Sequence, residues 1–222
     1  MGIAGRVTEV GFDMRIAIVG SGKIGSTLAQ LLLLAGHEVW IANRRGPDSL
    51  QDLVAGLGLR AHAATVAQAA EAAEVVIVAL PFGAFQDLPA DLLRGKVVID
   101  ATNYVVDRDG TIVAIETGQK TSTEVLVAHL PGARVVKTYN GIFWEHLRDD
   151  GRPSGGPNRR ALPLAGDDPD AKQTATQLLS DTGFDAVDAG ALSQGRRFQR
   201  GTPPYVQRYT ADELTDALNW TS

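Results

Sequence analysis

Short apolar runs of strand length alternate along this chain with longer segments of helical periodicity, and Gly or Pro residues separate them. Most of the runs are nearly continuous Val, Ile and Ala, which is typical of strands in a parallel sheet that is covered on both faces. The pattern predicts eight strands, at Arg15–Val19, Glu38–Ala42, Arg60–Ala63, Val75–Leu80, Lys96–Asp100, Arg134–Thr138, Ala161–Ala165 and Phe184–Asp188.

Several of the intervening segments carry helix start signals. Thr121 and Thr210 each precede a Glu by three residues, the spacing of a capping box, and Asp168 precedes Pro169 as an N-cap precedes the first helical position. The predicted helices are Ile24–Ala35, Pro47–Leu57, Thr65–Ala72, Ser122–Leu130, Pro169–Asp181 and Ala211–Leu218. Alternating strands and helices predict an α/β fold: a Rossmann-type, doubly wound, mostly parallel sheet with a small C-terminal α/β extension.

A glycine-rich segment joins the first predicted strand to the first predicted helix. It consists of Gly20, Ser21, Gly22, Lys23, Ile24 and Gly25. In this context GxGxxG is typical of dinucleotide binding, because the glycines permit a tight turn, a close approach of the pyrophosphate and close helix–strand packing. A P-loop needs Gly at position 17 and Ser or Thr at position 24, where this chain has Ala17 and Ile24.

The end of the second predicted strand indicates which nucleotide binds. NAD-binding folds place Asp or Glu there to accept a hydrogen bond from the ribose, whereas this chain has Asn43, Arg44 and Arg45, and Glu38 lies too early. Arginine offers a charge-assisted partner to a 2′-phosphate. The sequence therefore predicts NADP(H), and the alternative is that both arginines belong to a solvated turn.

The carboxyl ends of the later strands supply the other predicted contacts, since the cofactor crevice of such a sheet lies at that edge. Pro81 and Phe82 are predicted to line the nicotinamide half, with a plain strand end as an equal alternative. The cofactor contacts predicted at this edge are Ala79, Leu80, Pro81, Asn103 and Thr138. No catalytic residue is assigned, and the four scattered histidines predict no metal site.

Two irregular segments, Asp149–Arg160 and Ala189–Tyr209, suggest loops that contact a second substrate. We predict an N-terminal arm at residues 1–13, an NADP-binding Rossmann domain at 14–148, and a smaller C-terminal part at 149–222 that completes the substrate cleft. Six of the arginines in these segments lie in two clusters, which would attract an anionic substrate or would simply be solvated loop charges. They are Arg152, Arg159, Arg160, Arg196, Arg197 and Arg200.

Composition narrows the class of protein. A net charge of −5 argues against a nucleic-acid partner, and the apolar runs are far shorter than the roughly 20 residues that span a bilayer. The absence of cysteine excludes disulfides and thiolate chemistry, and it is compatible with the reducing cytoplasm in which we expect the protein to work.

The motifs GSGKIG, ANRR, ALPFGAF, DATNY, TSTEVLVAHLPGARVVKTYN and ALPLAGDD together resemble the NADP oxidoreductases that depend on the deazaflavin coenzyme F-420 (F420) and their bacterial relatives, described as predicted dinucleotide-binding reductases. The resemblance runs from Met14 to the C-terminus. It implies that residues 21–24 bind the pyrophosphate, Asn43 and Arg44 the 2′-phosphate, and Leu80 and Pro81 the nicotinamide half. It also implies a homodimer and F420 as a co-substrate.

Three functions fit these features. The first is hydride transfer between NADP(H) and a deazaflavin or similar acceptor, which requires positioning more than acid–base groups. The second is NADPH-dependent reduction of another small carbonyl, imine or flavin. The third is a non-catalytic NADP(H)-binding sensor, because a fold by itself does not fix a function.

Overall fold

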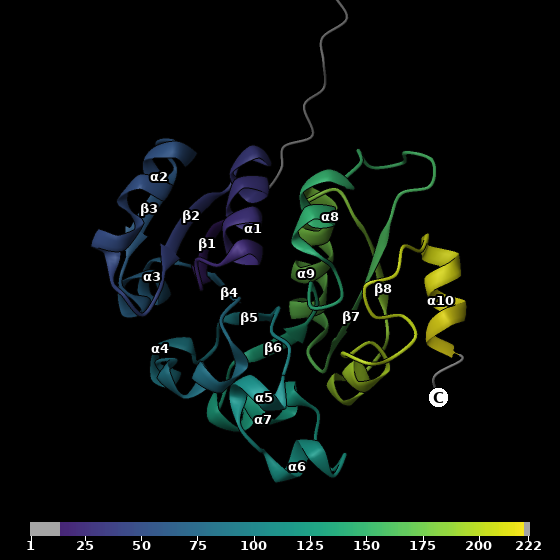
Figure 1. Cartoon of the computed structure of the whole chain (residues 1–222). Helices are drawn as coiled ribbons and strands as arrows, with labels where there is room; N and C mark the ends of the chain where they lie inside the picture. The colour runs from purple at the N-terminus through teal and green to yellow at the C-terminus, as the bar shows by residue number, and fades with distance from the viewer. Residues whose placement is uncertain (1–13, 220–222) are drawn as a thin grey trace, which may run out of the picture.

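The computed structural model describes residues 14–219, and an eight-stranded sheet runs through the molecule (Figure 1). The strand order is β3-β2-β1-β4-β5-β6-β7-β8, and neighbouring strands are parallel except for β6 and β7. The predicted Rossmann-type α/β fold with a mostly parallel, doubly wound sheet is confirmed. The predicted arm at residues 1–13 lies outside the described residues.

All eight predicted strands are present, with ends that shift by no more than two residues. The strands are β1 (Arg15–Val19), β2 (Glu38–Ala42), β3 (Ala61–Ala64), β4 (Val75–Val78), β5 (Val97–Asp100), β6 (Arg134–Lys137), β7 (Ala161–Gly166) and β8 (Asp185–Asp188). Strands β4 and β5 are buried along their whole length, as continuous apolar runs in a sheet covered on both faces should be.

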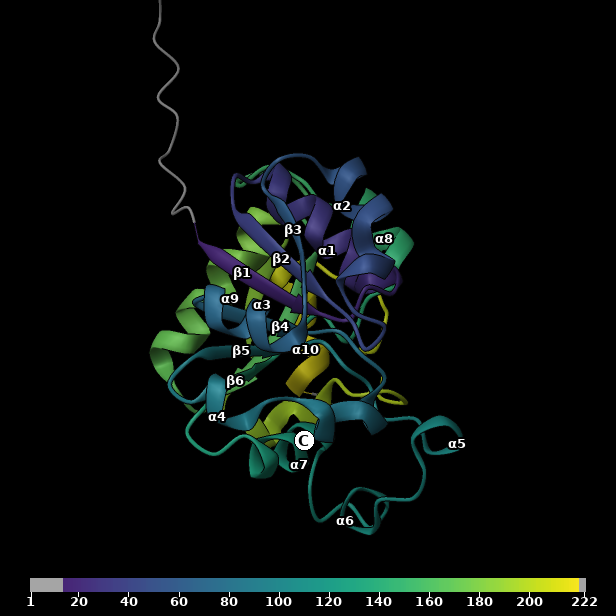
Figure 2. The ribbon, with the colours of Figure 1, turned by 90° about the vertical axis from the view of Figure 1, so that its left-hand side faces the viewer.

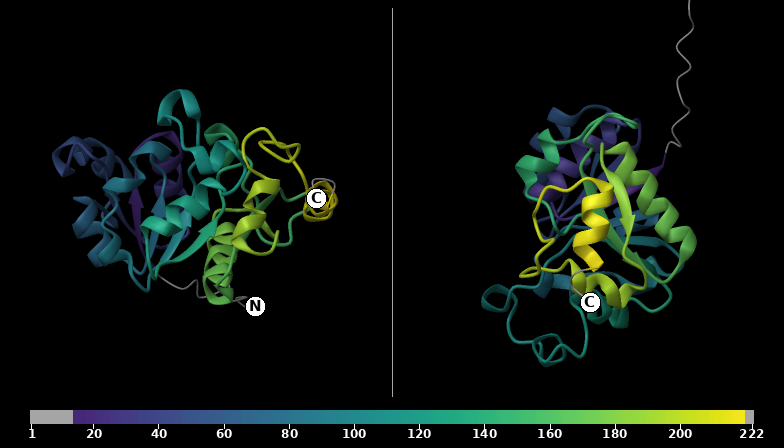
Figure 3. Two further views of the ribbon diagram at one scale, coloured as in Figure 1. Left: turned by 90° about the horizontal axis from the view of Figure 1, so that it is seen from below. Right: turned by 90° about the vertical axis from the view of Figure 1, so that its right-hand side faces the viewer.

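Helices cover both faces of the sheet and enclose three hydrophobic clusters, one on the first face and two on the other. One face packs against α1 (Lys23–Leu34), the η1 turn (Pro47–Leu50), α2 (Gln51–Leu57), α8 (Trp144–Asp149) and α9 (Pro169–Asp181). The other face packs against α3 (Val66–Ala72), the η2 turn (Phe82–Asp87), α4 (Ala90–Leu93), α7 (Ser122–His129), the η3 turn (Leu192–Arg197) and α10 (Ala211–Asn219). Helix α10 lies at the opposite end of the molecule from α2 (Figure 3).

The sequence did not predict the one-turn elements. These are η2, α4, η3, α8, α5 (Val106–Asp109) and α6 (Val113–Glu116). A segment of four to six residues shows too little of the 3.6-residue period to be recognised. Helices α5 and α6 project from the carboxyl edge of the sheet (Figure 2).

Capping accounts for two helix starts as predicted. The Thr121 side chain accepts from the backbone N–H of Glu124, whose carboxylate accepts from Thr121 in return, and Asp168 accepts from the N–H of Ala171.

Because β7 pairs with β6, the C-terminal part extends the same sheet, and its division at residue 149 stays a prediction. Among residues 14–219, no helix has the length and apolar character needed to cross a membrane.

Candidate functional site

The first glycine of the GSGKIG turn lies where β1, β2 and β4 end side by side. The backbone N–H of Gly20 donates to the carbonyl oxygen of Ala42 at 2.8 Å, and Gly20 has a φ of 120°. A Cβ at this position would lie 2.3 Å from the carbonyl oxygen of Ala79. Only glycine fits this close approach, which brings the chain from β1 across the sheet edge into α1.

The other two glycines differ in what surrounds them. A Cβ at Gly25 would lie 1.8 Å from the carbonyl oxygen of Gly20, so α1 packs directly on the turn. A Cβ at Gly22 would have no atom within 4 Å, and no side chain caps the start of α1 at this residue. The N–H groups of the first turn of α1 have no partner inside the helix. This open start therefore fits a pyrophosphate, which a side chain at Gly22 would displace.

The remaining residues of the turn are placed around this opening. Ser21 is half-buried and accepts a hydrogen bond through its hydroxyl, while Ile24 packs against the core under α1. Lys23 is exposed, and its Nζ lies 4.9 Å from the centroid of the Trp144 ring in α8. The six residues predicted from the fingerprint thus lie together at one end of α1.

Asn43 joins the turn after β2 to the GSGKIG turn. Its Nδ2 donates to the hydroxyls of Ser21 at 2.9 Å and Ser49 at 3.1 Å, and its Oδ1 accepts from the backbone N–H of Arg45 at 2.8 Å. The Asn43 amide therefore fixes the distance between the two turns, a role that its place in the sequence did not reveal.

Arg44 and Arg45 follow on the surface. Both side chains are exposed, and neither makes a hydrogen bond or ion pair with another residue in the described part of the chain. Through Asn43, this turn lies beside the open start of α1. The arrangement places two cations, rather than a carboxylate, at the end of β2, as NADP(H) requires.

After β4 the chain crosses the same edge. The backbone N–H of Ala79 donates to the carbonyl oxygen of Val19 at 2.8 Å, Leu80 is half-buried, and Pro81 is exposed. The prediction for Phe82 is wrong, because its side chain is fully buried and packs against the Phe85 ring. The η2 turn that buries Phe82 was not recognised, so a core residue was assigned to the crevice.

Two further predicted cofactor contacts, Asn103 after β5 and Thr138 after β6, differ in their exposure and in their hydrogen-bond partners. Asn103 is half-buried, and its Nδ2 donates to the carbonyl oxygen of Asn140 at 2.8 Å. Thr138 is fully buried, and its hydroxyl donates to the carbonyl oxygen of Pro163 in β7 at 2.9 Å. The Thr138 side chain thus joins β6 to β7, and a cofactor contact at this residue stays a prediction.

A buried ion pair lies beside them, which the sequence analysis missed. Asp100 and Lys137 are register partners on β5 and β6, and Lys137 Nζ lies 3.1 Å from Asp100 Oδ2, with the side chains 3% and 0% exposed. Burial lowers the pKa of Lys137, and the charge of Asp100 opposes that shift. The signal that could have revealed the pair is a single charged residue at the end of each of two apolar strands.

A cavity of about 220 Å³ opens next to this pair. Its lining residues come from β6, from the segments after β5 and η3, and from α6 and α7. They are Asn103, Tyr104, Ile115, Glu116, Ser122, Lys137, Gln199 and Arg200. Because Asn103 belongs both to the predicted cofactor contacts and to this lining, the cavity adjoins the predicted nicotinamide position.

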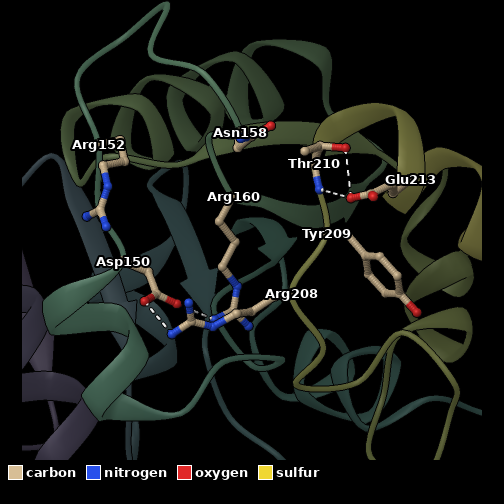
Figure 4. Close-up of a pocket in the computed structure, with 8 residues that line it drawn as sticks. All are labelled: Asp150, Arg152, Asn158, Arg160, Arg208, Tyr209, Thr210 and Glu213. Atoms are coloured by element: carbon tan, nitrogen blue, oxygen red, sulfur yellow. Dashed lines mark hydrogen bonds and ion pairs between the residues drawn. The ribbon is translucent and has the colours of Figure 1, made fainter.

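A second cavity of about 280 Å³ lies in the C-terminal part, between Arg152 and Glu213 (Figure 4). Asp150 holds two guanidinium groups there, that of Arg160 at 2.8 Å and that of Arg208 at 2.6 Å. None of the predicted cofactor contacts lines this cavity.

The arginines of the two irregular segments serve different purposes. Arg159 binds Asp185 at 2.6 Å and the carbonyl oxygen of Ser180, and Arg197 donates to the carbonyl oxygen of Leu218 in α10. These bonds join segments of the fold to one another, and accordingly Arg159 is buried and Arg197 is half-buried. Of the six arginines, Arg200 alone lines the cavity beside Lys137.

Tyr139 lies shortly after the end of β6, and its side chain is buried in the core. Its hydroxyl lies 2.8 Å from that of Thr182, and burial raises the pKa of Tyr139 well above its usual range. A neutral, buried phenol in a backbone conformation with a φ of 59° is a packing residue at a tight turn, not a proton donor to a substrate.

Comparisons with known proteins agree with this geometry. The family model described as NADP oxidoreductase coenzyme F420-dependent matches residues 15–104. The F420-dependent NADP reductase of Methanothermobacter marburgensis is 31% identical over 219 residues, which cover 92% of this chain and 96% of that protein. This chain belongs to the F420-dependent NADP oxidoreductase family. It is accordingly an NADP-dependent oxidoreductase.

Two solved structures are similar to this chain over most of its length. A hypothetical protein from Sinorhizobium meliloti superposes with a TM-score of 0.76 at 33% identity, covering 88% of this chain and 94% of its own. A candidate F420-dependent NADP reductase from Arthrobacter sp. gives a TM-score of 0.70 at 29% identity, covering 82% and 87%. The family membership places NADP among the cofactors of this oxidoreductase, and the identity of the acceptor is a separate question.

Proposed function

We propose that this oxidoreductase transfers a hydride between NADP(H) and a deazaflavin such as F420, or an acceptor of similar shape. The observation that carries the proposal is the 31% identity to an F420-dependent NADP reductase over nearly the whole of both chains. The cavity beside Asn103 supports it, because it offers a place for an acceptor next to the predicted nicotinamide position.

The chain's own residues would then act by positioning. The open start of α1 would hold the pyrophosphate on the N–H groups of residues 21–25, and Arg44 with Arg45 would hold the 2′-phosphate. Leu80 and Pro81 would border the nicotinamide half, which supplies the hydride when the cofactor is bound. Holding donor and acceptor in contact is the main contribution that such a transfer needs from a protein.

Purified protein with NADPH and oxidised F420 tests the proposal. We expect loss of the visible absorption band of the oxidised deazaflavin, with one NADPH consumed for each F420 reduced. NADPH consumption with a carbonyl, imine or free flavin, and none with F420, would instead favour the second function considered from the sequence.

The acceptor's anionic tail provides a sharper test. Arg200 is exposed at the cavity, so Arg200→Gln should raise KM for intact F420 several-fold, and more than for its tail-less deazaflavin core. The difference should shrink as salt is added, because exposed charges are screened within about 10 Å at 0.1 M ionic strength. Arg196→Gln is the matched control: Arg196 is also exposed, but it does not line the cavity, and it donates to the carbonyl oxygen of Ser193. Equal losses for both acceptors would remove Arg200 from tail recognition.

Arg44 should set the preference for NADPH. Arg44→Ala is expected to weaken NADPH binding by about 1.5–3 kcal/mol, the scale of a hydrogen bond to a charged group, and to leave NADH binding unchanged. Titration calorimetry with both nucleotides measures this. Arg15→Ala is the control, since Arg15 is an exposed arginine paired with Glu74 at the amino end of β1. Equal losses for NADPH and NADH would contradict the 2′-phosphate assignment.

A further inference from the structure

The cavity beside the predicted nicotinamide position is lined by a buried ammonium group. Lys137 Nζ donates to Asp100 Oδ2 at 3.1 Å and to the carbonyl oxygen of Thr102, and it makes no other hydrogen bond with the described residues. An ammonium group has three hydrogens. One N–H of a lysine that lines the cavity is therefore left for a molecule bound there.

Asp100 is built to keep that ammonium group charged and in place. Its Oδ1 accepts from the N–H of Thr102 at 2.9 Å and from the Thr102 hydroxyl at 2.6 Å, and its Oδ2 accepts from the Thr123 hydroxyl at 2.6 Å. These three donors hold the Asp100 side chain in place beside Lys137, and the charge of Asp100 favours the charged form of Lys137 against the effect of burial.

Fold stability alone does not account for such a pair. Two charges taken out of water recover little net free energy, and a well-packed apolar pair of similar volume is commonly as stable. The other strand positions on this face of β5 and β6 are apolar, at Val98 and Val135. An ion pair at the one position that borders a cavity points to a role in that cavity.

The rest of the lining leaves Lys137 as the buried cation facing the acceptor. Asn103, Ser122 and Gln199 are neutral, while Glu116 from α6 and Arg200 from the segment after η3 are exposed to solvent. Charges in contact with bulk water are screened, whereas a fixed charge in a desolvated site acts at close to full strength.

We propose that Lys137 is a catalytic residue that contacts the hydride acceptor in this cavity and stabilises the negative charge the acceptor gains, with Asp100 as its positioning residue. This inference rests on the proposed function. The hydride carries two electrons and one hydrogen to a ring carbon of the acceptor, and the ring's electron pair moves onto a nitrogen and carbonyl oxygen. Lys137 donates a hydrogen bond to that anion and keeps its own proton. A proton from solvent water completes the reduction.

The test replaces both charges together. Lys137→Met alone would leave Asp100 buried without its ion-pair partner, which would destabilise the fold. The double variant Lys137→Met with Asp100→Asn removes both charges at similar volume, and the Thr123 hydroxyl can accept as well as donate. In single-turnover reduction of F420 by NADPH, we expect the rate of hydride transfer to fall about 100-fold, the effect of losing one preorganised donor to a developing anion. NADPH affinity should change less than twofold.

Two further measurements separate a catalytic from a structural role. The wild-type rate should fall as pH rises through the pKa of Lys137, which lies below the ordinary lysine value of about 10.4, and the double variant should not show this fall. The control is Lys96→Met, which removes another partly buried lysine, bonded to the carbonyl oxygen of Ala73, before β5 at the other edge of the sheet. Its hydride-transfer rate should equal that of the wild type.

Each outcome decides a different claim. A folded double variant with an unchanged rate overturns the role of Lys137 and leaves the proposed function standing. If the double variant does not fold, the wild-type pH profile decides, and a rate that stays flat to pH 10.4 overturns the role. A wild type that reduces a free flavin but not F420, with the double variant slower on that flavin, refutes the deazaflavin assignment and supports Lys137. A wild type that reduces neither acceptor overturns both.

Discussion

Gly22→Val is expected to weaken NADPH binding more than 100-fold while the protein stays folded. A Cβ at this residue meets no protein atom within 4 Å, and the backbone, at φ −74° and ψ −175°, is extended and open to any residue. The cost to folding is therefore small. The added side chain would occupy the space that the pyrophosphate needs, and each lost hydrogen bond between an N–H and a phosphate is worth about 1.5–3 kcal/mol.

Calorimetric titration with NADPH and thermal unfolding of the same samples measure both halves of this prediction. Gly56→Val is the matched control, because Gly56 lies in α2 with nothing within 4 Å of its would-be Cβ and is remote from the turn in sequence. Unchanged NADPH affinity in a folded Gly22→Val protein would mean that the cofactor binds elsewhere.

Gly25→Ala, in contrast, should lower the stability of the folded protein. Its Cβ would lie 1.8 Å from the carbonyl oxygen of Gly20 and 3.3 Å from Ile18 Cγ2, so α1 would have to move away from β1. Overpacking commonly costs 1–3 kcal/mol, and a collision with backbone, which cannot rotate away, should cost about 3 kcal/mol or more. For a domain of this size that is a fall in Tm of roughly 6–12 °C.

Gly22→Ala is the control for this prediction, since it adds the same methyl group at the residue immediately before α1, where space is open. Its Tm should stay within about 1–2 °C of the wild type. A Gly25→Ala protein as stable as Gly22→Ala would show that α1 does not pack on the turn as closely as the structure indicates.

The sequence by itself determined the strands, the long helices and the fingerprint. Val75–Val78 and Val97–Asp100 could be recognised because a strand buried on both faces must be apolar at nearly every position. The start of α7 could be recognised because a capping box is a local motif in which Thr121 and Glu124 bond each other's backbone. The glycines of the turn followed from the same locality, since their spacing already implies the turn.

Only the tertiary structure decided which polar groups meet. Whether Phe82 lies in the crevice or in the core depends on the η2 turn and on its ring partners, Phe85 in the same turn and Tyr104 in the segment after β5. Which arginine lines the cavity depends on partners elsewhere in the chain: Arg197 is bound to the end of α10, and Arg200 is not.

The same reason applies to the ion pair. Asp100 and Lys137 are 37 residues apart, and each by itself looks like an ordinary charged residue at the end of a strand. Sheet register makes them partners on one face, and the packing of the segments after β5 and η3 leaves a cavity beside them. Local patterns specify elements because they are read over a few residues, whereas a site is formed by the register and packing of elements that the sequence keeps apart.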